Sequence, residues 1–193
     1  MTSQIRLTEL EAPSADTPSR LAEAAPRVVV VGDALLDGWW HGVTHRLCRE
    51  APAPVVELDD RVEAPGGAAN TALNAASLGA RVQFLGVVGD DVEGEHLQAQ
   101  LVAGGVDCSG LIAAPGFATT TKTRVVAGDQ IIARLDVLAQ DPPASARRAL
   151  AAWIRGVVPA ADAVVVCDYG LGTLDVDGVT FPAAEIVLEF LDP

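Results

Sequence analysis

The chain has 193 residues and a formal net charge of −13, and half of its residues are hydrophobic. This length allows one domain with a sizeable core, and the hydrophobic fraction indicates a globular chain. The excess of acidic residues argues against nucleic acids and anionic membranes as partners, because both are bound through basic patches. The three cysteines are widely spaced and form neither a metal-binding pattern nor a disulfide framework.

The first 26 residues are acidic and rich in proline and alanine, and they contain neither the basic nor the apolar region of a signal peptide. The apolar run from Val28 to Val31 is too short to span a membrane. We therefore expect residues 1–26 to be a disordered tail and the protein to be cytoplasmic.

The hydrophobic pattern then alternates strands with helices, which is typical of an α/β fold with a mostly parallel sheet. Turn residues occur around 39–42, at Asp59-Asp60 and at Gly128-Asp129, where the last pair predicts a hairpin. Helices are predicted at 68–78, 91–103 and 144–157. Strands are predicted at 27–31, 55–58, 61–64, 81–85, 119–127, 130–135 and 163–167.

The most informative motif opens the first of these helices and reads Pro65-Gly66-Gly67-Ala68-Ala69-Asn70. A pair of glycines lets the backbone approach a ligand without a side-chain clash, and the first turn of a helix presents free N–H groups. Asn70 would offer both a donor and an acceptor to a polyhydroxylated molecule. The alternative is a tight turn that leads into a core helix.

Carboxylates follow two predicted strands, at the edge where open α/β sheets bind their ligands. Asp33 and Asp37 follow the first strand, and Asp168 follows the last one. Either of the first two carboxylates could accept hydrogen bonds from vicinal sugar hydroxyls, although Asp33 could equally cap the next segment. The sequence contains neither a P-loop nor a dinucleotide-binding fingerprint.

Together these motifs resemble the pfkB/ribokinase family of sugar kinases, and within it the D-glycero-β-D-manno-heptose-7-phosphate kinase branch. The resemblance covers about residues 27–174 and implies a ribokinase-like fold, a mostly parallel sheet flanked by helices with a small β-lid. The lid would be formed mainly by residues 38–64 and the 119–135 hairpin. The segments that carry the resemblance are 30–33, 36–37, Arg46, 50–56, 65–70, 105–108, 121–125, Gln130, 134–136 and 168–170.

The resemblance also implies which residues bind the substrate. Lys122 and Arg124 would form a clamp for a sugar phosphate, although Lys122 could instead lie on a strand that faces solvent. Arg134 and Asp136 alternate on one strand face and form either a structural ion pair, which we favour, or a ligand contact. The residues that would hold the sugar hydroxyls are Asp33, Asp37, Gly66, Gly67 and Asn70.

The sequence departs from the heptose-7-phosphate kinase branch at two points. A lysine usually follows the Asp-Tyr-Gly turn, whereas this chain has Leu171, and no Gly-Ala-Gly-Asp motif occurs anywhere in the sequence. In the family that motif supplies the anion hole and the catalytic base, so no catalytic residue is predicted in this chain. ATP and Mg²⁺ are implied by the family, but their site is expected to be incomplete.

We therefore expect residues 27–174 to be the N-terminal portion of a sugar kinase domain, with the C-terminal part of the fold missing and residues 175–193 a divergent or truncated tail. Such a chain would show little or no kinase activity. The alternatives are a non-catalytic protein that binds a sugar phosphate and an unstable gene fragment. The resemblance implies a sugar phosphate as partner, and also a homodimer formed through the lid.

Overall fold

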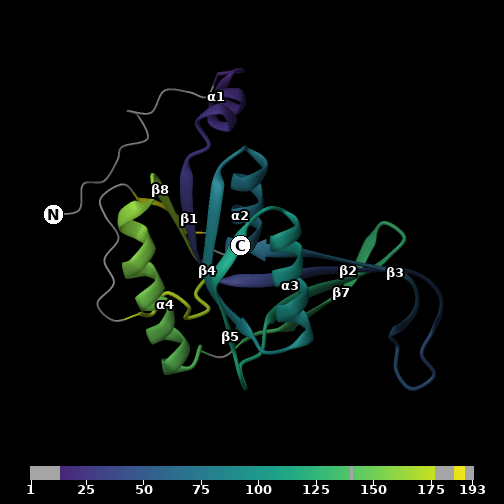
Figure 1. The fold of residues 1–193 in the computed structure, drawn as a ribbon. Helices are drawn as coiled ribbons and strands as arrows, with labels where there is room; N and C mark the ends of the chain where they lie inside the picture. Colours follow the sequence, from purple (N-terminus) through teal and green to yellow (C-terminus); the bar gives the residue numbers. More distant parts are fainter. Residues whose placement is uncertain (1–13, 140, 177–184, 190–193) are drawn as a thin grey trace.

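The computed structural model describes residues 14–139, 141–176 and 185–189, which form two sheets and the helices around them (Figure 1). The first sheet is parallel throughout, with the strand order β5-β4-β1-β8-β9. Its strands are β1 (Arg27–Gly32), β4 (Arg81–Gly89), β5 (Asp107–Ala114), β8 (Ala163–Asp168) and β9 (Glu185–Glu189).

Alternating valines in β1 build a core on each face of this sheet. Val28 and Val30 pack in the cluster formed with α2 (Ala68–Ser77) and α3 (Val92–Ala103), while Val29 and Val31 pack in the cluster formed with α4 (Ala144–Val157). The short 3₁₀ helix η2 (Val158–Ala160) follows α4. Since β1 is buried on both faces, the structure explains its unbroken apolar sequence.

The second sheet extends away from the first (Figure 1) and is hereafter called the lid sheet. Its strand order is β3-β2-β6-β7, in which β2 and β6 are parallel and the other neighbours are antiparallel. The expected α/β fold with a β-lid is thereby confirmed. The strands of the lid sheet are β2 (Ala34–Leu47), β3 (Pro54–Gly67), β6 (Thr120–Ala127) and β7 (Gln130–Val137).

Two predicted turns are wrong, because both lie inside the long ladder between β2 and β3. In this ladder Trp39 pairs with Val62, and His41 pairs with Asp60. The chain instead reverses at 48–53, where the amide of Cys48 donates to the Ala53 carbonyl. Cross-strand pairing thus overrides the local preference of aspartate and glycine for turns.

Helix α1 (Thr17–Ala24) lies in the segment that was expected to be disordered. Proline in its first turn is compatible with a helix start, and the helix ends at Ala25 in a left-handed conformation. Ala22 lies so close to Gly79 that a Cβ on Gly79 would come within 2.5 Å of the Ala22 Cα. Disorder is therefore the wrong prediction for this helix, and residues 1–13 lie outside the described residues.

The two edge strands of the parallel sheet were not predicted. β5 has the sequence DCSGLIAA, which lacks a run of β-branched residues, and β9 falls within the segment expected to diverge from the family. β9 nevertheless pairs in parallel with β8, from Val164 with Glu185 to Asp168 with Glu189.

Among the residues that the structure describes, no helix is long and apolar enough to cross a membrane.

Candidate functional site

Asp33 follows β1 and is almost completely buried, with 1% of its surface exposed. Its Oδ2 accepts hydrogen bonds from the amides of Tyr169 (2.8 Å) and Leu171 (3.1 Å), and its Oδ1 accepts one from the amide of Thr173 (3.2 Å). A buried carboxylate requires such partners. Asp33 therefore holds the distant loop after β8, and not the next segment of the chain, which was the alternative left open by the sequence.

That loop, residues 168–173, lies beside the glycine pair. Asp168 is exposed and accepts a hydrogen bond from the amide of Gly170 (2.9 Å), so it shapes the turn. A Cβ on Gly67 would lie 3.4 Å from the Tyr169 ring. Burial, and then the charges of Cys167, Asp37 and Asp33, raise the pKa of the Tyr169 hydroxyl. Tyr169 therefore stays protonated beside the two carboxylates.

Both glycines of the Gly66-Gly67 pair lie where a Cβ would come too close to another atom. A Cβ on Gly66 would come within 2.3 Å of the Asp37 Oδ2. Gly67 has a φ of +58°, and a Cβ there would lie 2.6 Å from the Asp33 carbonyl oxygen. The turn thus lies against both aspartates before α2 begins.

Asn70 is in the first turn of α2, and its side chain is exposed. Its Oδ1 accepts a hydrogen bond of 3.3 Å from the Nδ2 of Asn74, one turn further along the helix. The Asn70 amide is therefore both oriented by α2 and accessible, as a residue that binds a polyhydroxylated ligand needs to be.

Strand register places the remaining candidates on one face of the lid sheet. Asp37 on β2 pairs with Lys122 on β6, which pairs in turn with Asp136 on β7. Two residues further along β2 and β6, and two residues earlier on the antiparallel β7, the corresponding partners are Trp39, Arg124 and Arg134. Residues two apart in a strand share a face. We call this set the lid row: Asp37, Trp39, Lys122, Arg124, Arg134 and Asp136.

Charges within the lid row are paired with one another. The Nη1 of Arg124 donates to the Oδ1 of Asp37 at 2.9 Å, and both side chains are about one quarter exposed. The Arg124 guanidinium also lies 5.1 Å from the centroid of the Trp39 ring. The favoured ion pair between Arg134 and Asp136 is present at 3.0 Å. Lys122 is half-buried, so it is not a fully solvated side chain on an outer strand.

A contact that the sequence did not reveal fixes the start of β6. Asp91, the N-cap of α3, accepts hydrogen bonds from the Gly94 amide (2.8 Å) and from the Thr119 amide (2.8 Å) and hydroxyl (2.6 Å). Burial alone would raise the pKa of Asp91, but the bonds from Thr119 and Gly94 outweigh it and lower the pKa. The N-cap position of Asp91 can be read from sequence, whereas its contact with Thr119 cannot.

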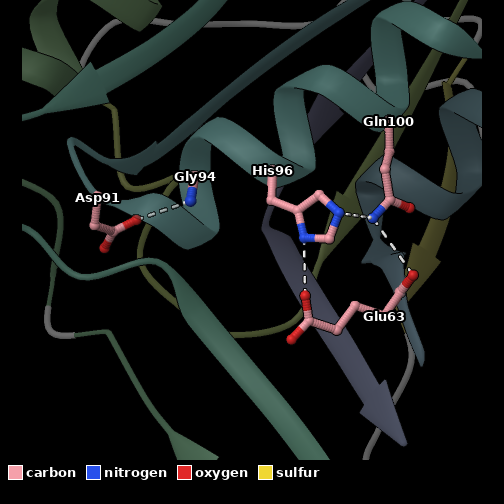
Figure 2. Close-up of polar contacts among 5 residues, drawn as sticks. All are labelled: Glu63, Asp91, Gly94, His96 and Gln100. Atoms are coloured by element: carbon pink, nitrogen blue, oxygen red, sulfur yellow. Dashed lines mark hydrogen bonds and ion pairs between the residues drawn. The ribbon is translucent and has the colours of Figure 1, made fainter. Parts of the chain in front are cut away.

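A second unpredicted contact links β3 of the lid sheet to α3 (Figure 2). The Nδ1 of His96 lies 2.8 Å from the Oε2 of Glu63. Gln100 places its Nε2 3.0 Å from the Nε2 of His96 and 3.4 Å from the Glu63 carbonyl oxygen. These contacts tie the lid sheet to the core.

The described residues offer no group of three His, Cys, Asp or Glu side chains able to hold a metal ion. Nothing in the site geometry marks a residue for Mg²⁺ or for ATP, so none is assigned to either. A cavity of about 500 Å³ lies at the opposite, amino-terminal end of β1 and β4 and contains none of the predicted site residues.

Comparison with known proteins identifies the lineage. Residues 25–169 match the pfkB family carbohydrate kinases. The bifunctional protein HldE of Helicobacter pylori is 42% identical over 150 residues, which is 77% of this chain but 32% of that protein. The chain thus spans about a third of the length of the curated relatives it matches.

Solved structures show the same fold. A carbohydrate kinase from Agrobacterium tumefaciens matches with a TM-score of 0.57 and 21% identity, over 73% of this chain and 45% of that one. An Arabidopsis thaliana ribokinase, solved with ribose and ATP, matches with a TM-score of 0.54 and 19% identity, over 74% and 45% of the two chains. The fold is ribokinase-like, and the chain belongs to the pfkB family of carbohydrate kinases.

Proposed function

We propose that this chain is the sugar-binding part of a carbohydrate kinase that transfers a phosphoryl group from ATP to a sugar phosphate resembling heptose 7-phosphate. Membership of the pfkB family and the similarity to HldE support this reaction class. The lid row is the observation that carries the proposal, because it brings cations and carboxylates together on one face beside the glycine pair.

In this proposal, residues of the lid row and of α2 bind different groups of the substrate. Asp37 and Asn70 bind the sugar hydroxyls, since a carboxylate accepts hydrogen bonds from vicinal hydroxyls and an amide both donates and accepts them. Lys122 and Arg124 bind the phosphate, because a guanidinium offers a planar fork of donors and an ammonium a compact charge. These cations act locally against the acidic charge of the whole chain.

The other candidates have supporting roles. Asp33, Gly66 and Gly67 shape the turn on which the sugar rests, because their contacts are with the backbone and side chains of the chain itself. Asp168 shapes the neighbouring loop. Arg134 and Asp136 extend the lid row at β7 and stabilise its outer strand.

ATP with Mg²⁺ supplies the phosphoryl group in this reaction class, while the residues of this chain bind and orient the acceptor sugar. The sequence has no Gly-Ala-Gly-Asp motif to provide the base and the anion hole. We propose that the 193-residue chain binds the sugar phosphate but does not turn over ATP.

A cytoplasmic location and a homodimer formed through the lid belong to the same proposal. Leu135 and Val137 support the dimer, because they are about half exposed on β7 and alternate with the residues of the lid row. Large exposed apolar side chains on a sheet are typical of surfaces that pair.

Incubation of the purified chain with ATP, Mg²⁺ and a panel of phosphosugars, including D-glycero-D-manno-heptose 7-phosphate, tests the proposal. We expect calorimetry to show binding of the heptose phosphate, and a coupled assay to show no ADP formation. The absence of binding to any phosphosugar would overturn the proposed substrate class. ADP formation that disappears in Asn70→Ala would overturn the proposed lack of turnover.

A further inference from the structure

One oxygen of Asp37 already accepts a hydrogen bond from within the protein. Oδ1 accepts this bond from the Nη1 of Arg124 at 2.9 Å, whereas Oδ2 lies near Gly66, where a Cβ would come within 2.3 Å of it. A sugar hydroxyl that binds Asp37 through Oδ1, in line with the proposed function, therefore competes with Arg124 for this oxygen.

Trp39 holds the same guanidinium from a second direction. Trp39 and Arg124 are neighbours in the β2–β6 ladder, and the guanidinium carbon lies 5.1 Å from the ring centroid. An aromatic ring attracts a guanidinium through its face and does not use the N–H donors in the guanidinium plane. The ring therefore keeps Arg124 in place while its N–H groups exchange one acceptor for another.

The charges around Arg124 favour such an exchange with a phosphate. The lid row contains three cations, Lys122, Arg124 and Arg134, and two carboxylates, Asp37 and Asp136. A phosphate that approaches the row can accept the charge-assisted hydrogen bond that Asp37 gives up. A sugar without a phosphate offers Arg124 no such replacement.

We propose that Trp39 is a positioning residue that makes the lid row select sugars carrying a phosphate. The substrate phosphate takes the N–H donor of Arg124 from Asp37, and the freed Asp37 carboxylate accepts a sugar hydroxyl. Trp39 holds the guanidinium in reach of both partners throughout. A ligand gains full affinity only when it carries both groups, and this inference rests on the proposed function of the site.

Calorimetric titrations of the full chain with heptose 7-phosphate, with unphosphorylated heptose and with inorganic phosphate test the inference. The variants are Trp39→Leu and the more conservative Trp39→Phe. Trp40→Leu is the matched control, because Trp40 is the next residue in β2 and its ring stacks instead with Arg61, at 4.6 Å. Circular dichroism and urea unfolding establish that each variant is folded.

We expect Trp39→Leu to weaken the binding of heptose 7-phosphate by about 3- to 30-fold, the range expected for the loss of a cation–π contact. Trp39→Phe should retain part of the affinity, because phenylalanine keeps an aromatic face. Binding of unphosphorylated heptose should stay at its wild-type level in both variants. Trp40→Leu should leave all three affinities unchanged.

The outcomes separate the inference from the proposed function. Wild-type affinity for heptose 7-phosphate in Trp39→Leu would overturn the role of Trp39 and leave the proposed function standing. An equal loss for heptose and heptose 7-phosphate would also overturn it, because Trp39 would then support the fold rather than phosphate selection. If the wild-type chain binds none of the three ligands, the proposed function and the inference both fail.

Discussion

Asp33 and Asp37 are four residues apart after the same strand, yet they lie in opposite environments. Asp33 is buried and accepts three hydrogen bonds from backbone amides of the loop after β8. Asp37 is partly exposed on the lid sheet and accepts one from the side chain of Arg124. Backbone amides cannot leave without unfolding the loop, whereas a side chain can exchange partners. The first site stabilises the fold, and the second is suited to a ligand.

The largest expected effect on stability comes from Asp33→Ala, which leaves the amides of Tyr169, Leu171 and Thr173 without their acceptor. Unsatisfied buried donors are costly, so we expect the free energy of unfolding to fall by about 4 kcal/mol. Urea denaturation measures this loss. The free energy of unfolding of Asp33→Asn should lie between those of Asp33→Ala and wild type, because asparagine retains one acceptor oxygen. A loss below about 1 kcal/mol in Asp33→Ala would contradict the claim that Asp33 stabilises the fold more than Asp37 does.

Gly67→Ala tests whether the turn next to Asp33 is equally rigid. A Cβ at Gly67 would lie 2.6 Å from the Asp33 carbonyl oxygen in a backbone with positive φ, and we expect a loss of about 3 kcal/mol. Gly105→Ala is the control, since its φ is also positive but a Cβ there meets no atom within 4 Å. The control should cost only about 1 kcal/mol. Thermal unfolding measures both variants. If Gly67→Ala and Gly105→Ala lose the same stability, the close approach to the Asp33 carbonyl does not add to the cost of Gly67→Ala.

Asp91→Ala should have a smaller effect, which depends on pH. Asp91 caps α3 and binds Thr119, so its loss should cost about 1–2 kcal/mol near neutral pH. The pKa of Asp91 in the folded protein lies below the ordinary aspartate value of 3.8, so the stability from Asp91 is present above that value. It is lost as the pH falls through the folded pKa. Urea unfolding from pH 7 to pH 3 should therefore show wild type and variant converging at the acidic end.

The smallest change in stability is expected for Asp37→Asn, at about 0–1 kcal/mol, because the partner is a partly exposed side chain. Binding should respond more strongly. A neutral acceptor forms a weaker hydrogen bond with a sugar hydroxyl, so the affinity for heptose 7-phosphate should fall by about tenfold. The affinity for inorganic phosphate should not fall, since Arg124 is released. Calorimetry checks both values, and a parallel loss for the two ligands would contradict the exchange of partners at Asp37.

Local sequence patterns were sufficient for much of the fold. The valines of β1, the helices α2 and α4, and the β6–β7 hairpin follow from apolar runs, periodicity and the Gly128-Asp129 turn. The patterns failed for the β2–β3 ladder, whose turn-forming residues are held extended by pairing along both strands. They also failed for β5, which the neighbouring β4 stabilises as an edge strand.

The sequence singled out the residues of the candidate site but not the contacts that each of them makes. Nothing in Gly32-Asp33 and Leu36-Asp37 distinguishes a buried cap from an exposed acceptor, because the partners of Asp33 lie more than 130 positions away. The contact of Asp91 with Thr119 and that of Glu63 with His96 join residues 28 and 33 positions apart. Such pairings arise only when the strands adopt their register. Trp39 was missed because its role depends on the parallel register between β2 and β6.

The central claim is that the lid row and the start of α2 bind a sugar phosphate while the buried Asp33 does not contact it. Mapping of ¹H–¹⁵N shifts on the labelled chain, titrated with heptose 7-phosphate, tests this claim most directly. We predict the largest changes at Asp37, Asn70, Lys122 and Arg124, with small changes at Val28 and Val82 at the amino-terminal end of the sheet. Changes centred on Arg27 and Arg81 beside the 500 Å³ cavity, or none at all, would contradict it.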